Sequence, residues 1–140
     1  EALLAENAPT PAALGADIDR ALQRGEDIVV FTSRQPLRAA TAEENLAIAR
    51  RVSAYLCAVV SALKTAPRYL LAKGGITSSD VATKSLAVRR ATILGQILAG
   101  VPVWRPGAES KFPGLSYIVF PGNVGDAGAV TEVVRRLGRD

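Results

Sequence analysis

The sequence has no histidine and only one cysteine, Cys57, among its 140 residues. The absence of histidine excludes Ser-His-Asp and Cys-His catalysis, and it also excludes a zinc site built from cysteine and histidine. A single thiol cannot form a disulfide framework and suits a reducing compartment, so we expect a cytoplasmic protein. We interpret Cys57 as a packing residue within a helix.

Long apolar runs are missing as well. YLCAVV at 55–60 is among the longest, whereas a membrane helix needs roughly 18 such residues. No basic-then-apolar leader opens the chain, so we expect no membrane partner. The few aromatic residues and the scattered basic pairs behind the net charge of +4 disfavour nucleic-acid binding, whereas a small anionic ligand agrees with this charge.

Methionine is absent, even at position 1, so we expect the chain to be part of a longer polypeptide. Its 140 residues are enough for one compact domain and too few for two. We therefore predict a single domain over residues 1–140.

Helical patterns with start signals occur at several places. Thr10 followed by Pro11 predicts a helix start, and Thr41 with Glu44 has the spacing of a capping box. The predicted helices run over 10–25, over 41–64, from a Thr77 cap with Asp80 reaching back, and from an Asp126 cap to Leu137.

Apolar runs rich in β-branched residues alternate with these helices. The predicted strands are 27–33, 68–72, 91–98, 100–107 and 115–120. Alternation of this kind predicts an α/β fold, layered and Rossmann-like, with a mostly parallel sheet and flanking helices. We also expect the loop 105–114 to be a mobile flap.

Two glycine-rich turns join a strand to a helix, within YLLAKGGITSSDVA (69–82) and FPGNVGDAGA (120–129). Glycine lets the backbone approach an oxyanion, and the first N–H groups and dipole of a helix favour phosphate. Two such turns can clamp one nucleotide. Neither matches the phosphate-loop or dinucleotide pattern, so two ordinary tight turns remain the alternative interpretation.

The ordered motifs GGITSSDVATKSLAV, GVPVW and FPGNVG resemble the C-terminal, nucleotide-binding domain of the four-carbon acid sugar kinase family. That family usually reads Gly-Gly-Glu-Thr-Ser, Gly-Val-Pro-Trp and Lys-Ser-Gly-Asn-Phe-Gly at these places. VVFTSR (29–34) is similar to an earlier strand end of the family. The resemblance covers nearly the whole chain.

The resemblance implies a kinase that uses ATP and Mg²⁺ to phosphorylate a four-carbon sugar acid such as a 3-oxo-tetronate, erythronate or threonate. A separate N-terminal domain would supply most of the binding site for the acid. The chain is also expected to pair with a second copy of itself as a homodimer. This chain alone is expected to bind nucleotide weakly and to catalyse nothing. No metal ligand or catalytic residue is assigned to it. The implied nucleotide-binding residues are Gly74, Gly75, Ile76, Thr77, Ser78, Gly122 and Asn123.

The sequence departs from the family pattern at both turns. Ile76 stands where an acidic residue is usual, Phe120 and Pro121 stand where Lys-Ser is usual, and Val124 replaces phenylalanine. The isoleucine side chain cannot order a metal-bound water, although its backbone can still face phosphate. Lys73 or Lys111 can replace the missing lysine. These departures also agree with another hypothesis, a non-catalytic module for metabolite-anion binding or oligomerisation.

Several other residues allow two interpretations. Trp104 is either an adenine-stacking residue or a core anchor, and Asp80 is either a helix cap or a ligand of magnesium or its water. Residues 32–34 (Thr-Ser-Arg) are either part of a ligand site at a strand end or an ordinary loop. Glu43 and Glu44 complement a helix dipole and are not a catalytic pair.

Overall fold

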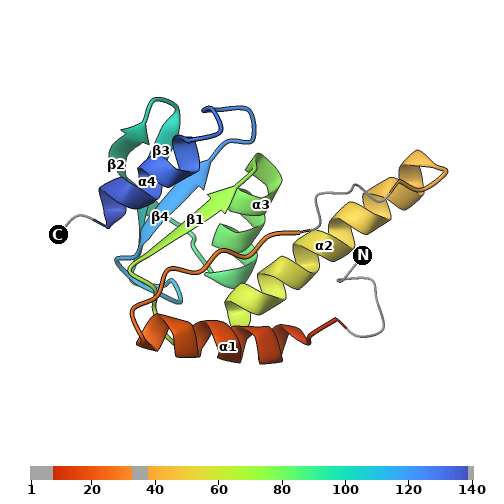
Figure 1. Cartoon of the computed structure of the whole chain (residues 1–140), viewed down its shortest axis with the longest axis horizontal. Helices are drawn as coiled ribbons and strands as arrows, with labels where there is room; N and C mark the ends of the chain where they lie inside the picture. The colour runs from red at the N-terminus through yellow and green to blue at the C-terminus, as the bar shows by residue number, and fades with distance from the viewer. Residues whose placement is uncertain (1–7, 33–37, 139–140) are drawn as a thin grey trace. The chain divides into compact units, whose positions relative to one another are not determined.

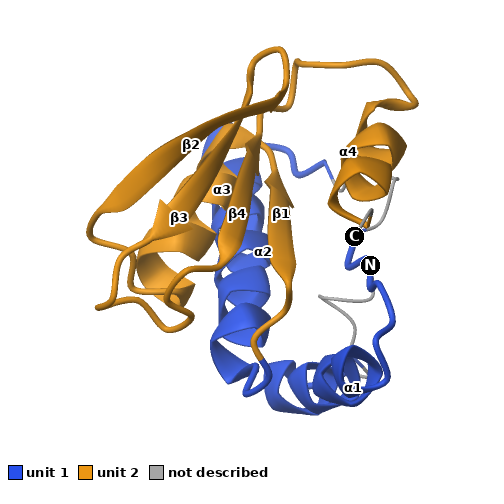
Figure 2. Cartoon of the chain, turned by 90° about the vertical axis from the view of Figure 1, so that its left-hand side faces the viewer, with its two compact units in different colours: residues 1–65 blue, residues 66–140 orange. Residues whose placement is uncertain are grey.

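The computed structural model describes residues 8–32 and 38–138 (Figure 1). The chain divides into two compact units, residues 1–65 and residues 66–140 (Figure 2). That residues 1–140 fold as a single domain stays a prediction. No helix in the described part of the chain is long and apolar enough to cross a bilayer.

The first unit contains α1 (Pro11–Gln23) and α2 (Ala42–Ala62). The Thr10 hydroxyl accepts a backbone hydrogen bond at the start of α1. At the start of α2, Thr41 and Glu44 each accept the other's backbone N–H. Both predicted helix starts are therefore confirmed.

The two helices of this unit pack closely at one end. A Cβ built on Gly15 would lie 2.9 Å from the Cβ of Ala62, so only glycine allows this approach. Nearby, the buried carboxylate of Asp19 accepts the backbone N–H groups of Lys64 and Thr65, at 3.0 and 2.8 Å. These bonds join α1 to the chain that leaves α2.

The prediction of a strand at 27–33 is wrong for the part of this range that the structure describes, residues 27–32. Residues 27–32 form no strand, and Val29 and Phe31 are 78% and 76% exposed. An apolar run becomes a strand only where a neighbouring strand accepts its backbone hydrogen bonds. None of the four strands in the described ranges pairs with it. Ser33 and Arg34 lie outside the described residues.

The second unit is built on a sheet with the strand order β1-β4-β3-β2. Its strands are β1 (Tyr69–Lys73), β2 (Ala91–Leu98), β3 (Val101–Pro106) and β4 (Ser116–Phe120). The α/β class with flanking helices is confirmed. The expectation of a mostly parallel sheet is corrected, because only β1 and β4 are parallel, whereas β3 is antiparallel to both of its neighbours. The short connection at 99–100 joins β2 to β3, and such a connection permits only antiparallel pairing.

One face of this sheet carries α3 (Gly75–Asp80) and its direct continuation, the π-helix η1 (Val81–Ser85). The buried Tyr117 points to this face and donates its hydroxyl to the carbonyl of Ser78 at 2.7 Å. This bond attaches α3 to β4.

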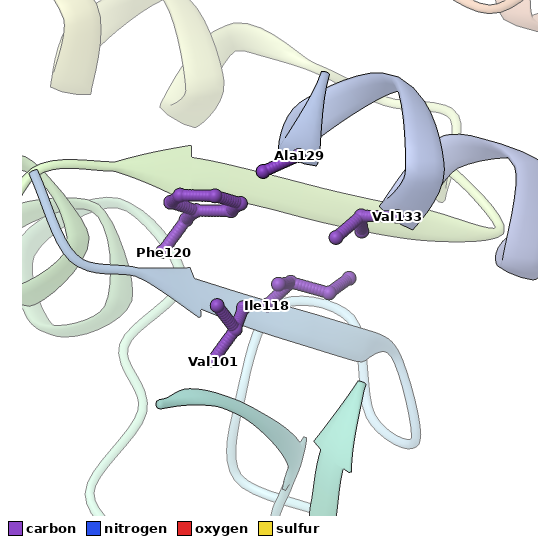
Figure 3. Packing of buried hydrophobic residues seen from close by; sticks show 5 residues of the cluster. All are labelled: Val101, Ile118, Phe120, Ala129 and Val133. Atoms are coloured by element: carbon purple, nitrogen blue, oxygen red, sulfur yellow. The ribbon is translucent and has the colours of Figure 1, made fainter. Parts of the chain in front are cut away.

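The other face carries α4 (Ala129–Leu137) (Figure 1). Side chains alternate along a strand, so Ile118 and Phe120 point away from α3 and pack against Ala129 and Val133 of α4 (Figure 3). All four are buried. The helices on the two faces thus hold β4 at the centre of the unit.

Both helices of this unit begin at residues other than the predicted caps. The N-cap of α3 is Gly74, so Thr77 lies inside the first turn, and Asp80 pairs with Lys84. In α4 the helix begins after Gly128, whose N–H donates to the Asp126 side chain. In each case a glycine, and not a side-chain cap, precedes the helix.

Candidate functional site

The two glycine turns lie next to each other. β1 and β4 are parallel, and Lys73 and Phe120 are paired at their carboxyl ends. The Gly74 N–H donates to the Phe120 carbonyl at 2.8 Å. A Cβ built on Gly122 would lie 3.9 Å from the Cα of Gly74. The sheet therefore brings together the two segments that the sequence singled out.

The first turn presents backbone N–H groups to open space. Gly74 has a φ of 104°, which favours glycine, and no side chain caps the helix. The N–H groups of Gly75, Ile76 and Thr77 lie in the first turn, where intrahelical acceptors do not exist. A Cβ on Gly75 would have no atom within 4 Å, and the Ile76 side chain is 78% exposed.

Ser78 is positioned differently from the other candidates in this turn. Its side chain is buried, and its hydroxyl lies 2.7 Å from the Ala72 carbonyl and 2.8 Å from the Gly74 carbonyl. The hydroxyl of Ser78 therefore stabilises the turn from within and does not face the open side.

In the second turn, Gly122 and Asn123 are both exposed. Gly125, three residues after Gly122, has a φ of 78°, and a Cβ at this position would lie 2.5 Å from the Cβ of Ala129. Glycine at this position lets the turn close against the first residue of α4.

Lys73 supplies a positive charge between the turns. Its Nζ lies 4.3 Å from the centroid of the Phe120 ring and 3.5 Å from the Pro121 carbonyl oxygen. Phe120 stands where the resembling family has lysine. An ammonium group thus reaches the second turn from the neighbouring strand.

Lys111 and the loop around it lie at the other end of β4, because this loop leads into the first residue of the strand. Five residues of strand span roughly 13 Å. The N–H groups of Gly107 and Lys111 donate to the carbonyls of Arg90 and Leu86, and Phe112 is buried. The expectations of a mobile flap and of a phosphate contact from Lys111 are corrected.

Trp104 also lies away from the turns. It pairs with Tyr117 in the middle of β3, and the two ring centroids are 6.2 Å apart. Trp104 itself lines a separate cavity of about 280 Å³, together with Ile93 and Arg89. This placement agrees with a packing role for Trp104.

In the ranges 8–32 and 38–138, no three His, Cys, Asp or Glu side chains gather as metal ligands. The carboxylate of Asp80 lies 2.8 Å from Lys84 Nζ. Magnesium commonly binds proteins through one or two carboxylates and the phosphates of a substrate. The described residues therefore form no magnesium site from several protein carboxylates.

A cavity of about 590 Å³, which was not predicted from the sequence, adjoins the second turn. It lies between Ala99 in the β2–β3 connection, Val124 in the turn, and Glu132 on α4. These segments are far apart in the sequence and meet only because β3 begins beside the end of β4. The glycines at 100 and 125, both with positive φ, were the available local signals.

Parallel strands that lead through glycine turns into a helix define a nucleotide-binding α/β domain. The family model described as a nucleotide-binding C-terminal domain matches residues 1–130, and the chain belongs to this family. The resemblance to the C-terminal domain of the four-carbon acid sugar kinase family is thereby confirmed.

The fold is similar to that of a protein from Bordetella bronchiseptica described as a domain of unknown function, DUF1537, with bound citrate and a domain-swapped dimer. One crystal form has 19% identity and a TM-score of 0.61 over 96% of this chain and 32% of that chain. A second has 18% identity and a TM-score of 0.56 over 92% and 32%. The chain thus spans about a third of the length of these structures. No curated protein matches.

Proposed function

We propose that the chain is the ATP-binding domain of a kinase that phosphorylates a four-carbon sugar acid. The observation that carries this proposal is the contact between the two turns, with Gly122 beside Gly74 at the carboxyl ends of β1 and β4. The N–H groups of Gly75, Ile76 and Thr77 would bind the β- and γ-phosphates together with the backbone at Gly122 and Asn123.

Phosphoryl transfer needs mainly positioning and neutralisation of charge. In this proposal the backbone of the two turns positions the triphosphate, and Lys73 Nζ neutralises part of its charge. Magnesium would arrive with the nucleotide and supply further charge neutralisation. The acceptor hydroxyl and the base that takes its proton would belong to another domain of the longer protein.

The citrate bound to the DUF1537 structures supports an acidic substrate. Citrate is a small polycarboxylate, and a sugar acid shares its carboxylate and hydroxyl chemistry. This likeness concerns the class of substrate, a small hydroxy acid.

A thermal-shift titration with Mg·ATP tests the nucleotide site. A ligand at a hundred times its Kd stabilises a protein by about 2.7 kcal/mol, so we expect a clear rise in Tm. Gly75→Asp should abolish this rise, because its carboxylate would repel phosphate in the first turn. An acidic side chain at a helix start is itself stabilising, so the ligand-free Tm should not fall.

Gly75→Ala is the matched control. Its methyl group would meet no atom within 4 Å and carries no charge, so the rise in Tm with Mg·ATP should persist. The absence of any shift with nucleotide in the unmodified chain would contradict the proposal.

A second candidate function is a non-catalytic module that binds a metabolite anion or mediates dimerisation. The domain-swapped dimers with citrate favour this candidate. A rise in Tm with citrate but none with Mg·ATP, in a chain that sediments as a dimer, would support it over the kinase domain.

A further inference from the structure

The cavity near Trp104 lies between η1 and the antiparallel strands β2 and β3. Ala82 and Thr83 of η1 line one side of it, and Ile93 and Trp104, which are paired across the two strands, line the other. Trp104 is in ring contact with Tyr117, so the cavity is on the face of the sheet that carries α3. It is separate from the glycine turns, which follow the carboxyl ends of β1 and β4.

Backbone hydrogen bonds fix the walls of this cavity. The Val88 N–H donates to the Ala82 carbonyl at 2.9 Å, and the Gly107 N–H donates to the Arg90 carbonyl at 3.1 Å. Just before Val88 the chain turns at Ala87, whose φ of 53° is uncommon for a residue other than glycine. Such conformations, like π-helical segments, are often found at functional sites. The cavity is therefore preformed.

One positive charge at this cavity is not neutralised within the described part of the chain. The Glu109 carboxylate accepts the Arg90 N–H at 3.1 Å and lies 3.6 Å from Arg90 Nε, so it balances the charge of Arg90. Arg89 also lines the cavity, and its guanidinium forms no ion pair with a side chain in the ranges 8–32 and 38–138. A guanidinium presents a planar pair of N–H donors that matches a carboxylate.

Most of the remaining lining is apolar. The Ile93 side chain is 59% exposed, and Val88 and Trp104 are half-buried. An apolar group would replace water favourably on this surface. A polyhydroxylated acid would lose hydrogen bonds to water there. The volume of about 280 Å³ lies just below the roughly 300–1,000 Å³ typical of drug-sized ligands, so the cavity suits a smaller molecule than a nucleotide.

We propose that this cavity binds a small organic anion with one carboxylate and an apolar body. The carboxylate pairs with the Arg89 guanidinium, and the apolar body lies against Trp104, Ile93 and Val88. This ligand differs in chemistry from both the nucleotide and the sugar acid of the proposed function. No residue of the glycine turns takes part, so the inference does not depend on the kinase assignment.

Titrations with phenylacetate and with its uncharged analogue phenylacetamide test the site. The chain has one tryptophan, so the single indole N–H signal in proton–nitrogen correlation spectra reports on the cavity directly. We expect this signal to shift saturably with phenylacetate, with a Kd of about 1 mM or lower. The Kd for phenylacetamide should be about tenfold higher, and Arg89→Gln should raise the Kd for phenylacetate by a similar factor.

Arg105→Gln is the matched control. It removes the same charge from the residue next to Trp104, but side chains alternate along β3 and Arg105 does not line the cavity. Its Kd for phenylacetate should therefore be unchanged. The ligand-free Tm of Arg89→Gln should also be unchanged, which would show that this variant is folded.

Three results would overturn the proposal. The first is an indole signal that does not move at a phenylacetate concentration about tenfold above the expected Kd. The second is equal affinity for phenylacetate and phenylacetamide. The third is an equal loss of affinity in Arg89→Gln and Arg105→Gln, which would show a general attraction of anions to a basic protein. None of these measurements involves ATP, so their outcome is independent of the proposed nucleotide site.

Discussion

Lys73 is the side chain that best accounts for the altered second turn. The family pattern has lysine where this chain has Phe120. The Phe120 ring instead lies under the Lys73 ammonium, 4.3 Å from ring centroid to Nζ. Because β1 and β4 are paired at these two residues, a positive charge can reach the same turn from either strand.

We expect Lys73→Gln to raise the Kd for Mg·ATP about tenfold, which corresponds to roughly 1.4 kcal/mol and is typical of a hydrogen bond to a charged group. The cause would be the loss of a charge that neutralises phosphate. Titration calorimetry at constant ionic strength measures the change, and Lys73→Arg should retain most of the affinity.

Lys111→Gln provides a matched comparison. Lys111 Nζ lies 5.5 Å from the Phe112 ring centroid, so it also faces an aromatic ring, but in the loop at the far end of β4. Its replacement should leave the Kd unchanged. A similar loss of Mg·ATP affinity in both variants would indicate a general effect of net charge and would contradict a specific role for Lys73.

At the scale of whole elements, Asp19 joins α1 to the segment that follows α2. Burial of its carboxyl raises the pKa, but the N–H groups of Thr65 and Lys64, the Thr65 hydroxyl and the charge of Lys64 together outweigh burial and hold the pKa of Asp19 below its ordinary value. A pKa lower in the folded than in the unfolded state means stability that is fully present above about pH 4, the unfolded value. This stability is lost as the pH falls through the folded pKa.

We therefore expect Asp19→Asn to lower the free energy of unfolding by about 1–3 kcal/mol at pH 7. The loss should shrink as the pH falls from about 4, the unfolded value, through the lower pKa of the folded state, because the unfolded chain takes up a proton before the folded carboxyl does. Urea denaturation at pH 7 and near pH 3 measures both values. Asp17→Asn is the control, because the Asp17 side chain is 62% exposed in its ion pair with Arg20 and such pairs contribute little. If Asp19→Asn lowered the free energy of unfolding equally at both pH values, the result would contradict a role for the negative charge of Asp19.

Elements with local signals were predicted well from the sequence. Thr10 with Pro11, and Thr41 with Glu44, specify helix starts within four residues of chain. The strands at 91–98 and 115–120 were predicted within one residue of their observed bounds. The glycine turns were also identified, because glycine at the end of a strand is informative by itself.

Features that depend on distant segments were not predicted. Residues 27–32 have the composition of a strand, but strand formation requires a partner. β3 pairs antiparallel with β2 because only two residues connect them. The sequence was not recognised as a β-hairpin at this connection. The cavity near Ala99, and the position of Lys73 over Phe120, depend on strand register, which one sequence without a turn signal does not specify.

At the scale of the whole molecule, the chain spans about a third of the length of the DUF1537 structures. In the proposed function the two glycine turns bind the nucleotide, and the acceptor belongs to another domain. We predict that this chain alone, with Mg·ATP and erythronate or threonate, releases no ADP above the uncatalysed rate. The full-length protein should release ADP with one of these acids, and a coupled assay measures this.

Gly75→Asp in the full-length protein should abolish that release, whereas Gly75→Ala should preserve it. Turnover by the 140-residue chain with either acid would show that the chain itself holds both substrates. Such a result would contradict the division of labour between two domains.

In the proposed site, the first turn would offer its ligand mainly amides of the main chain, and this has an evolutionary consequence. Every residue except proline carries the same amide, so a lineage can exchange Ile76 for almost any residue and keep the recognition chemistry. Gly74, with its φ of 104°, resists exchange because of its backbone conformation. Sites of this kind can drift beyond the reach of motif searches and stay active, so a deep mutational scan here should find tolerance at 76 and intolerance at 74.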